Sequence, residues 1–356
     1  MGIPYFSLAP GLNVSKLCLG TMTFGQQNCF QESCELLDRA SAAGINFIDA
    51  AEMYPVPQHP NTQGKTEEYI GRWLRIRKLP RDHFVLATKV TGPSGQMTWI
   101  RDGPKSLDAY NIEEAIDNSL LRLGTDYIDL YQIHWPDRYV PMFGETEYDP
   151  TQQYAAVPIE EQLEALGRAF NAGKIRYVGV SNETPYGVME FCRLAQLVPH
   201  YPRIVSIQNV YNLLCRNFDA GLAECCHHER VRLLAYSPLA MGLLSGKYFA
   251  ADGGPVDARF NVFKGKGKMT ICRRGITIQS IQEQCYCCNQ AFVLRHPLVG
   301  SVIFGATKPW QLREVLDAYN FPLTTQIFCI PDVGSWQGLF LTINELLTFV
   351  VVGHDL

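Results

Sequence analysis

The chain has 356 residues, of which 47% are hydrophobic and 19% are charged, enough for one large α/β domain or two ordinary ones. Its formal net charge of −4 argues against a nucleic-acid-binding protein, because such proteins usually carry a basic surplus or a basic stripe. No apolar run reaches the roughly 18 residues that a membrane-spanning helix needs, so no membrane association is expected.

The 12 cysteines do not indicate disulfide bonds, because the chain is long and its start shows no secretory signal. Two cysteine-rich stretches, "ECCHHE" at 224–229 and "CYCC" at 285–288, have adjacent cysteines, whereas zinc ligands are usually spaced by two to four residues. We therefore expect reduced thiols and no metal site. A cytoplasmic location is expected, and a monomer is the default expectation because the sequence does not indicate an oligomeric state. A plastid location is the alternative if a leader peptide is missing from the sequence.

Strand and helix patterns alternate along the chain. The first residues, "YFSLAPGLNVSKLCLG", predict a β-hairpin with its turn near Gly11 and Leu12. Short β-branched or aromatic runs then predict strands, and apolar residues at three- and four-residue spacing predict helices. Strands are expected over residues 16–25, 45–49, 83–90, 126–135, 174–182, 203–211, 231–239 and 300–308. Helices are expected over residues 31–44, 65–76, 111–124, 158–173, 184–197, 218–230 and 309–319.

This alternation predicts an α/β fold, namely a (β/α)8 TIM barrel with an N-terminal β-hairpin. Eight strand–helix units over about 300 residues are typical of that barrel, and Gly44, Gly124 and Gly173 stand where helices should end. A doubly wound sheet would usually show a "GxGxxG" motif after an early strand. The nearest stretch here, "GTMTFG", lacks the middle glycine.

Two segments depart from the alternation, namely residues 261–290 and residues 327–356. Neither shows a clean amphipathic helix where one is expected. We therefore assign residues 1–326 to the barrel, with a disrupted seventh-helix region at 261–290. Residues 327–356 are expected to form an atypical C-terminal tail.

Chemically useful residues stand at the ends of three consecutive strands, where a barrel of this type builds its active site. The second strand ends on Asp49, the third on Lys89 and the fourth on His134, while Tyr54 lies in the loop after the second. Singly, each has an ordinary interpretation, such as a helix cap, a lysine reaching the rim or a core histidine. Together they favour an active site.

The four side chains suggest a proton donor. A tyrosine has a pKa near 10, and a nearby ammonium such as that of Lys89 should lower it. Asp49 would hold that ammonium, and His134 would orient a carbonyl oxygen toward Tyr54. An acid that protonates an oxyanion as it forms suits hydride addition to a carbonyl group, so a reduced nicotinamide is the expected cofactor.

From about Tyr5 to about Tyr319 the chain resembles the aldo-keto reductases. The resemblance is carried by "LGTMTFG", "GINFIDAAEMYP", "ATKV", "NSLLRLGTDYIDLYQIHWPD", "GKIRYVGVSN", "IQNVYNLL", "AYSPLAMGLLSGKY" and "GATKPWQL". The inserts "EMYPVPQHPNTQGKTE" and "HWPDRYVPMFGE" are most similar to the Tas-like branch of bacteria and plants. The resemblance implies a (β/α)8 barrel and an NADP(H)-dependent reductase of small carbonyl compounds. It also implies a catalytic tetrad of Asp49, Tyr54, Lys89 and His134.

The same resemblance implies where a dinucleotide would bind. The nicotinamide and its carboxamide would contact Ser181, Asn182, Gln208 and Tyr236. The pyrophosphate would be held by Ser237, Leu239, Met241, Lys247 and Arg259. The adenosine end would lie on Gly305, Ala306, Thr307, Lys308, Gln311 and Glu314, and Gly20, Thr21 and Met22 complete the set. The substrate pocket is expected to be walled by Phe24, Met53 and Trp135, with Trp99 as a further candidate.

Two departures from the family pattern affect these expectations. Many members have an arginine for the 2′-phosphate where Gln311 stands, so Lys308, Arg313 or Arg259 would have to supply that charge here. NADP(H) is favoured as the cofactor, with NAD(H) as the alternative. Family members also carry a regular helix within residues 261–290, where this sequence is rich in cysteine and arginine, as an altered reading frame or splice choice would produce.

Two rival functions follow from the same features. The same fold also serves as a channel-associated subunit, so a regulatory sensor that binds a nicotinamide nucleotide with little turnover is the alternative to an enzyme. A third possibility is an inactive product of the disrupted segment. The intact tetrad favours the enzyme.

Overall fold

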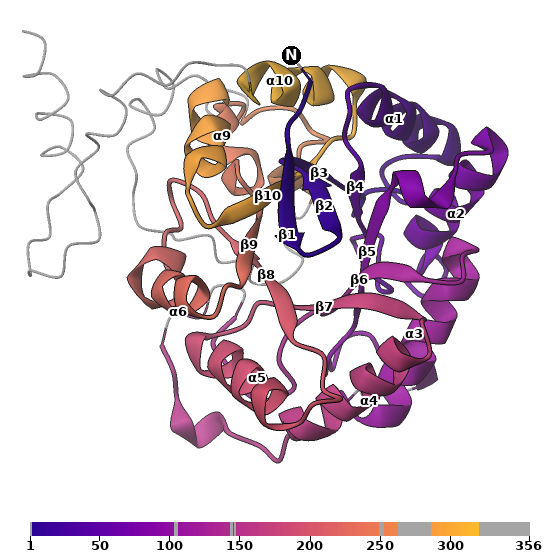
Figure 1. Ribbon diagram of the computed structural model, residues 1–356. Helices are drawn as coiled ribbons and strands as arrows, with labels where there is room; N and C mark the ends of the chain where they lie inside the picture. Colours follow the sequence, from indigo (N-terminus) through magenta and orange to yellow (C-terminus); the bar gives the residue numbers. More distant parts are fainter. Residues whose placement is uncertain are drawn as a thin grey trace, which may run out of the picture.

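Eight parallel strands close into a barrel in the computed structural model, which describes residues 2–102, 106–142, 145, 147–248, 253–262 and 286–319, without the side chains of residues 260 and 286–290. The closed order is β10-β3-β4-β5-β6-β7-β8-β9, so the predicted (β/α)8 architecture is confirmed (Figure 1). The barrel strands are β3 (Leu17–Gly20), β4 (Phe47–Asp49), β5 (Val85–Val90), β6 (Ile128–Ile133), β7 (Ile175–Ser181), β8 (Ile204–Val210), β9 (Arg232–Tyr236) and β10 (Val299–Gly305).

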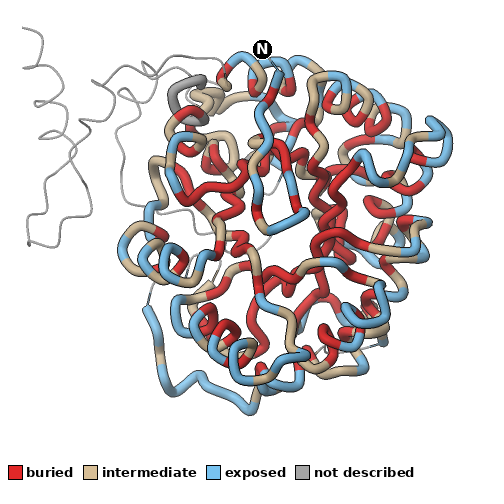
Figure 2. The backbone as a smooth tube through the Cα atoms, viewed as in Figure 1, coloured by how far each residue is buried: buried red, intermediate tan, exposed pale blue. Residues whose placement is uncertain are grey.

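Helices surround the barrel and expose their polar faces, so buried residues concentrate on the strands and on the inner helix faces (Figure 2). Gly44, Gly124 and Gly173, each with a positive φ, follow α1, α3 and α4 as predicted. None of the described helices is both long and apolar enough to cross a bilayer. The helices are α1 (Phe30–Ala42), α2 (Lys65–Arg77), α3 (Ala109–Leu123), α4 (Ile159–Asn171), α5 (Pro185–Leu197), α6 (Ala223–His228), α7 (Arg259–Val262), α9 (Tyr286–Arg295) and α10 (Pro309–Tyr319).

The predicted N-terminal hairpin is also confirmed. Strands β1 (Tyr5–Ala9) and β2 (Leu12–Ser15) pair antiparallel around Gly11, whose φ of 82° requires the freedom of glycine. In Figure 1 the hairpin lies across one end of the barrel. Its buried side chains Leu8, Leu12 and Val14 pack with apolar residues of the barrel strands, so the hairpin closes the N-terminal end.

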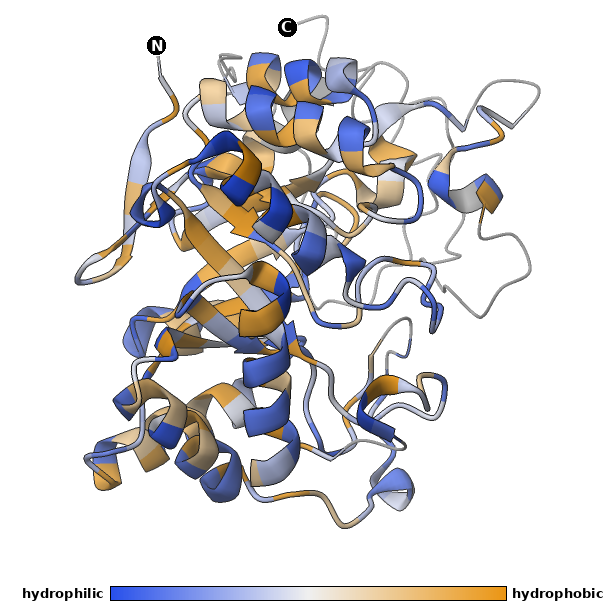
Figure 3. Ribbon diagram, turned by 90° about the vertical axis from the view of Figure 1, so that its right-hand side faces the viewer, coloured by the Kyte–Doolittle hydropathy of each residue, from blue (hydrophilic) through white to orange (hydrophobic). Residues whose placement is uncertain are grey.

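The barrel interior changes character along its axis. Near the hairpin it is filled by apolar side chains such as Phe47, Val85, Leu130 and Leu234, and Figure 3 shows the strands as the hydrophobic centre of the molecule. Burying each such side chain contributes about 1.5–3 kcal/mol. A larger apolar cluster fills the space between strands and helices. This packing fixes the strand ends, where the polar residues lie.

The two segments that depart from the sequence pattern lie mostly outside the described residues. Within 261–290 the backbone is helical at the end of α7 and at the start of α9. Helix α9 contacts α10 and β10, and its Val293 is fully buried. The expected tail at 327–356 lies wholly outside the described residues, so the division into a barrel and a tail stays a prediction.

Gly71 allows α2 to approach the end of α3 closely. A Cβ atom at this position would lie 2.3 Å from the Leu123 carbonyl oxygen and 2.8 Å from that of Arg122. Because backbone atoms cannot move aside cheaply, we expect Gly71→Ala to lower the free energy of unfolding by about 1–3 kcal/mol in urea titrations.

The matched control is Gly221→Ala, because the nearest atom to a Cβ there is Pro185 Cγ at 3.9 Å. We expect this control to change the free energy of unfolding by less than about 0.5 kcal/mol. Equal effects of the two substitutions would contradict the close approach at Gly71.

Candidate active site

The ends of β4, β5 and β6 bring the predicted tetrad together. These three strands are neighbours in the barrel, and Asp49 ends β4 while Lys89 is the penultimate residue of β5. His134 follows β6 directly, and its backbone N–H donates to the Val90 carbonyl, 3.1 Å away. Tyr54 lies in the loop after β4. This loop is held by a hydrogen bond from the Gly64 N–H to the Tyr54 backbone carbonyl, 2.9 Å away.

Asp49 and Lys89 form a buried ion pair whose hydrogen-bonding groups are well satisfied. Lys89 Nζ donates to Asp49 Oδ2 at 2.7 Å and to the Ala50 carbonyl at 2.6 Å. Asp49 Oδ1 accepts from Gln208 Nε2 at 2.9 Å and from Gln132 Nε2 at 3.3 Å. Burial works to lower the pKa of Lys89, but the nearby Asp49 and Tyr54 give it a net rise. The lysine therefore stays charged.

Tyr54 lies against both Lys89 and His134. The Lys89 ammonium is 5.1 Å from the centroid of the Tyr54 ring, and the Tyr54 and His134 rings meet edge to face with centroids 5.7 Å apart. Burial raises the pKa of Tyr54, Lys89 acts to lower it and Asp49 to raise it, and the net direction is upward.

The sequence predicted that Lys89 would bring the pKa of Tyr54 below its ordinary value. This prediction is wrong, because the net shift of the Tyr54 pKa is upward. The Lys89 contribution has the predicted direction, but desolvation of the phenol is larger. The hydroxyl group consequently carries its proton at neutral pH, which is the state that a proton donor requires.

His134 is a neutral, buried imidazole. Burial and the adjacent Lys89 charge hold its pKa well below the ordinary value. Its Nδ1 atom is buried and has no hydrogen-bond partner among the residues that the structure describes. A neutral ring whose Nδ1 lacks a partner can carry its proton on Nε2.

The neutrality of His134 predicts a pH dependence of stability. Below pH 6.5 the histidine is protonated in the unfolded state, whereas His134 stays neutral in the folded state. Proton binding therefore favours the unfolded state as the pH falls. We expect the free energy of unfolding to fall by up to about 1.4 kcal/mol per pH unit from this group alone, with no contribution above pH 7.5. Urea unfolding of the wild type and of His134→Gln between pH 7.5 and 5.5 measures the difference in slope. Parallel slopes would show that His134 titrates normally.

The residues expected near a carboxamide form one hydrogen-bonded group beside the tetrad. Ser181 Oγ donates to the Gln208 carbonyl at 2.7 Å, and Asn182 Nδ2 donates to the His134 carbonyl at 2.9 Å. The Tyr236 hydroxyl donates to Asn182 Oδ1 at 2.7 Å. Asn182 has a φ of 54°, so its backbone is in the left-handed region. The structure thus brings these four residues together.

The loop after β9 carries Lys247, and a second cation, Arg259, follows at the start of α7. The loop runs through Ser237 and Leu239 to Met241, with left-handed backbone at Ser237 and Met241. Burial lowers the pKa of Lys247, and the charge of Arg259 lowers it further. Neither cation forms an ion pair with a carboxylate among the described residues. Two partly buried cations without such a partner fit an anionic group such as a pyrophosphate.

The residues expected at the adenosine end lie where β10 leads into α10. Gln311 Oε1 accepts from Thr307 N–H at 2.7 Å and from Lys308 N–H at 3.2 Å, so this side chain caps the start of α10. Lys308 Nζ lies 3.6 Å from Glu32 Oε1 on α1. Gly305, Lys308 and Glu314 are exposed, whereas Ala306 is buried.

The position of Arg259 differs from that of the α10 residues. Arg259 begins α7 and therefore lies outside the β10–α10 region. Of the three cations considered for a 2′-phosphate, only Lys308 and Arg313 belong to the β10–α10 region.

The first barrel strand, β3, and the residues after it lie at the rim of the candidate site. Gly20 ends β3, and Thr21 Oγ1 donates to the Asp49 carbonyl at 2.8 Å. Met53 and Trp135 share an apolar cluster with Tyr54, and Met22 and Trp99 pack against it. Phe24 has no exposed surface and belongs to the main core, so the structure does not group it with this cluster.

A second buried ion pair beside the tetrad was not identified from the sequence. The Glu52 carboxylate pairs with Arg101 and also accepts from the Thr91 N–H at 2.5 Å. This pair joins the loop that carries Tyr54 to the segment after β5. A charged residue inside the apolar stretch "DAAEMYP" is the signal that could have pointed to Glu52.

A third ion pair links the loops after β6 and β7. Arg138 Nη1 and Nη2 bind the two carboxylate oxygens of Glu183 at 2.7 and 2.8 Å. Within the described part of the chain, no group of three His, Cys, Asp or Glu side chains is arranged to hold a metal ion.

Similarity to known proteins assigns this barrel to a class of oxidoreductases. Residues 16–330 match the model of the aldo/keto reductase family, and the chain belongs to this family. Membership implies NAD(P)H-dependent oxidoreductase activity on carbonyl compounds.

Three relatives illustrate the range of the family around this chain. It is 44% identical to "Protein tas" of Escherichia coli (strain K12) over 331 residues, which cover 91% of this chain and 94% of that protein. It is 39% identical to an "Aldo-keto reductase" of Babesia bovis over 282 residues, which cover 74% of this chain and 95% of that protein. It is also 30% identical to a "Probable voltage-gated potassium channel subunit beta" of Oryza sativa subsp. japonica over 330 residues, covering 88% and 90%.

Proposed function

We propose that the chain is an NADPH-dependent reductase of aldehydes or ketones with Tyr54 as the general acid. The observation that carries this proposal is the position of the Lys89 ammonium. It is hydrogen-bonded to Asp49 on one side and lies 5.1 Å from the ring centroid of Tyr54 on the other, with neutral His134 against the same ring.

Each of the four residues has a separate task in this proposal. Asp49 and the Ala50 carbonyl fix Lys89 so that its charge stays beside the phenol. His134 donates from Nε2 to the carbonyl oxygen of the substrate and orients it. Tyr54 releases its proton to that oxygen, and the Lys89 charge stabilises the phenolate that remains. The bound dinucleotide would supply the hydride.

The proposed dinucleotide-holding residues divide by chemistry. Ser181, Asn182 and Gln208 offer hydroxyl and amide groups for a carboxamide, and Tyr236 offers an aromatic face. Lys247 and Arg259 would hold the pyrophosphate, because both are cations without an ion-pair partner among the described carboxylates. Lys308 and Arg313 would contact the 2′-phosphate, which favours NADPH over NADH.

A fluorescence titration with NADPH and NADH tests this assignment. We expect Arg259→Gln to weaken the binding of both nucleotides by roughly tenfold, because both contain the pyrophosphate. We expect Lys308→Gln combined with Arg313→Gln to weaken NADPH by a similar factor and to leave NADH within about twofold. Equal losses for the two nucleotides in this double variant would place the 2′-phosphate elsewhere.

A regulatory sensor is the second candidate function. It is favoured by the similarity to a relative described as a probable channel subunit. An enzyme oxidises NADPH when an aldehyde is added, whereas a sensor binds the nucleotide with little turnover. We also propose that the enzyme is a monomer, which light scattering on the purified chain measures directly.

A further inference from the structure

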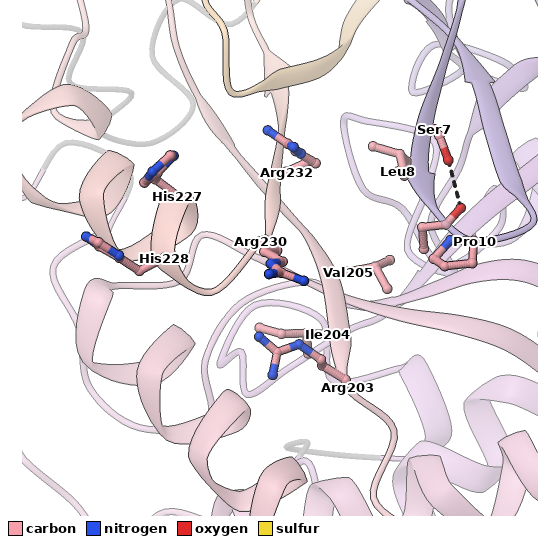
Figure 4. Close-up of a pocket in the computed structure, with 11 residues that line it drawn as sticks. Ser7, Leu8, Pro10, Arg203, Ile204, Val205, His227, His228, Arg230 and Arg232 are labelled. Atoms are coloured by element: carbon pink, nitrogen blue, oxygen red, sulfur yellow. Dashed lines mark hydrogen bonds between the residues drawn. The ribbon is translucent and has the colours of Figure 1, made fainter.

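The structure contains a hollow of about 770 Å³ at the end of the barrel opposite the tetrad. Its wall is formed by the hairpin segment Ser7–Pro10 on one side, and by the starts of β8 and β9 and the end of α6 on the other (Figure 4). Strand β8 begins at Ile204 and β9 at Arg232, so these are the N-terminal ends of the strands. None of the residues assigned to catalysis or to dinucleotide binding lines it.

The charged side chains that line this hollow, which we call the basal pocket, are all basic. Arg203, Arg230 and Arg232 line it together with His227 and His228 (Figure 4). Arg203 pairs with Glu229, whose carboxylate lies 2.8 Å away. Among the described residues, neither Arg230 nor Arg232 forms an ion pair with a carboxylate.

A further cation increases the positive charge beside the pocket. Lys16 Nζ lies 4.3 Å from the centroid of the Phe6 ring, and the Arg232 guanidinium lies 5.4 Å from the same centroid. Burial lowers the pKa of Lys16, and the charge of Arg232 lowers it further. Two cations therefore share one aromatic ring, although the chain as a whole has a net charge of −4.

Like charges repel, so the clustered basic side chains oppose one another when no anion is bound. Water screens part of this repulsion at the exposed Arg230, and the contacts of Lys16 and Arg232 with the Phe6 ring offset another part. An anion bound in the pocket would remove the remainder. Guanidinium groups bind carboxylate and phosphate oxygens through paired N–H donors, and a cluster of several arginines fits a ligand with several negative charges, such as linked phosphates. The volume exceeds that of a single phosphate ion, and Leu8 and Val205 add apolar surface for an organic part.

We propose that the basal pocket binds a small organic molecule that carries two or three linked phosphates. The pocket is concave and is walled by a hairpin on one side, which favours a compact ligand over a membrane surface. Because it lies at the opposite end of the barrel, this proposal is independent of the proposed dinucleotide site. A ligand there would contact the hairpin and two strands at once, and would stabilise the barrel by mass action.

Calorimetric titration of the full chain with inorganic tripolyphosphate tests the proposal. We expect saturable binding that the double variant Arg230→Gln/Arg232→Gln weakens by roughly tenfold at low ionic strength. The exposed Arg75→Gln on α2 is the matched control and should stay within about twofold. The single variant Arg230→Gln should give an intermediate loss, which guards against misfolding of the double variant. NADPH-dependent turnover should be the same in all four proteins.

Three results would overturn the proposal. The first is no saturable binding of tripolyphosphate to the wild type. The second is binding that Lys247→Gln/Arg259→Gln abolishes and Arg230→Gln/Arg232→Gln leaves unchanged, since the anion would then occupy the opposite end. The third is binding of phosphatidylserine vesicles, lost in Arg230→Gln/Arg232→Gln, without binding of tripolyphosphate. That result would assign the surface to a membrane instead.

Discussion

Tyr54→Phe should lower the turnover number for carbonyl reduction by two orders of magnitude or more, in the upper part of the range for a lost general acid. The substitution removes one oxygen atom and leaves the ring in contact with His134 and with the Met53 and Trp135 cluster. Steady-state NADPH oxidation measures the loss, and a fluorescence titration with NADPH should show affinity within about threefold of the wild type.

The control for this prediction is Tyr131→Phe. Tyr131 is fully buried on β6 and its hydroxyl has no partner among the described residues, so its loss should leave turnover within about twofold. Unchanged turnover in Tyr54→Phe would mean that another group donates the proton, and the assignment of the acid would be wrong.

Lys89→Met should damage both stability and activity. It leaves the Asp49 carboxylate buried without its cation, and breaking such a pair usually lowers the free energy of unfolding by about 3–5 kcal/mol. It also removes the charge that stabilises the Tyr54 phenolate, so turnover should fall by at least about a hundredfold. Urea unfolding and NADPH oxidation measure the two effects separately.

The double variant Asp49→Asn/Lys89→Met separates these causes. Removing the unpaired carboxylate should restore part of the lost stability, because a neutral amide is cheaper to bury than a lone charge. Turnover should not recover, since no ammonium remains beside Tyr54. If the two substitutions were simply additive in stability, Asp49 and Lys89 would not act as a buried pair.

The barrel could be predicted from the sequence because each strand–helix unit is formed by residues that are close together in the chain. Each strand is a short apolar run, and α1, α3 and α4 end near glycines with positive φ, for example Gly124 and Gly173. The site could be located for the same reason, since a parallel barrel gathers its strand ends and Asp49, Lys89 and His134 stand at three of them.

The remaining features depend on packing between distant segments. The net pKa of Tyr54 is set by how deeply its loop is buried, which no local pattern records. The Glu52–Arg101 pair requires two loops to meet, and the burial of Phe24 depends on how the main core cluster packs around it. The side-chain oxygen of Gln311, Oε1, caps the start of α10, a role that depends on the local backbone geometry.

One measurement tests the central claim most directly, namely NADPH oxidation by the purified full chain with an aromatic aldehyde such as 4-nitrobenzaldehyde. We predict saturable, aldehyde-dependent oxidation with a turnover number of about 1 s⁻¹ or higher, lost in Tyr54→Phe. Saturable NADPH binding without aldehyde-dependent oxidation, across aliphatic and aromatic aldehydes, would contradict a catalytic role for the phenol that lies beside Lys89.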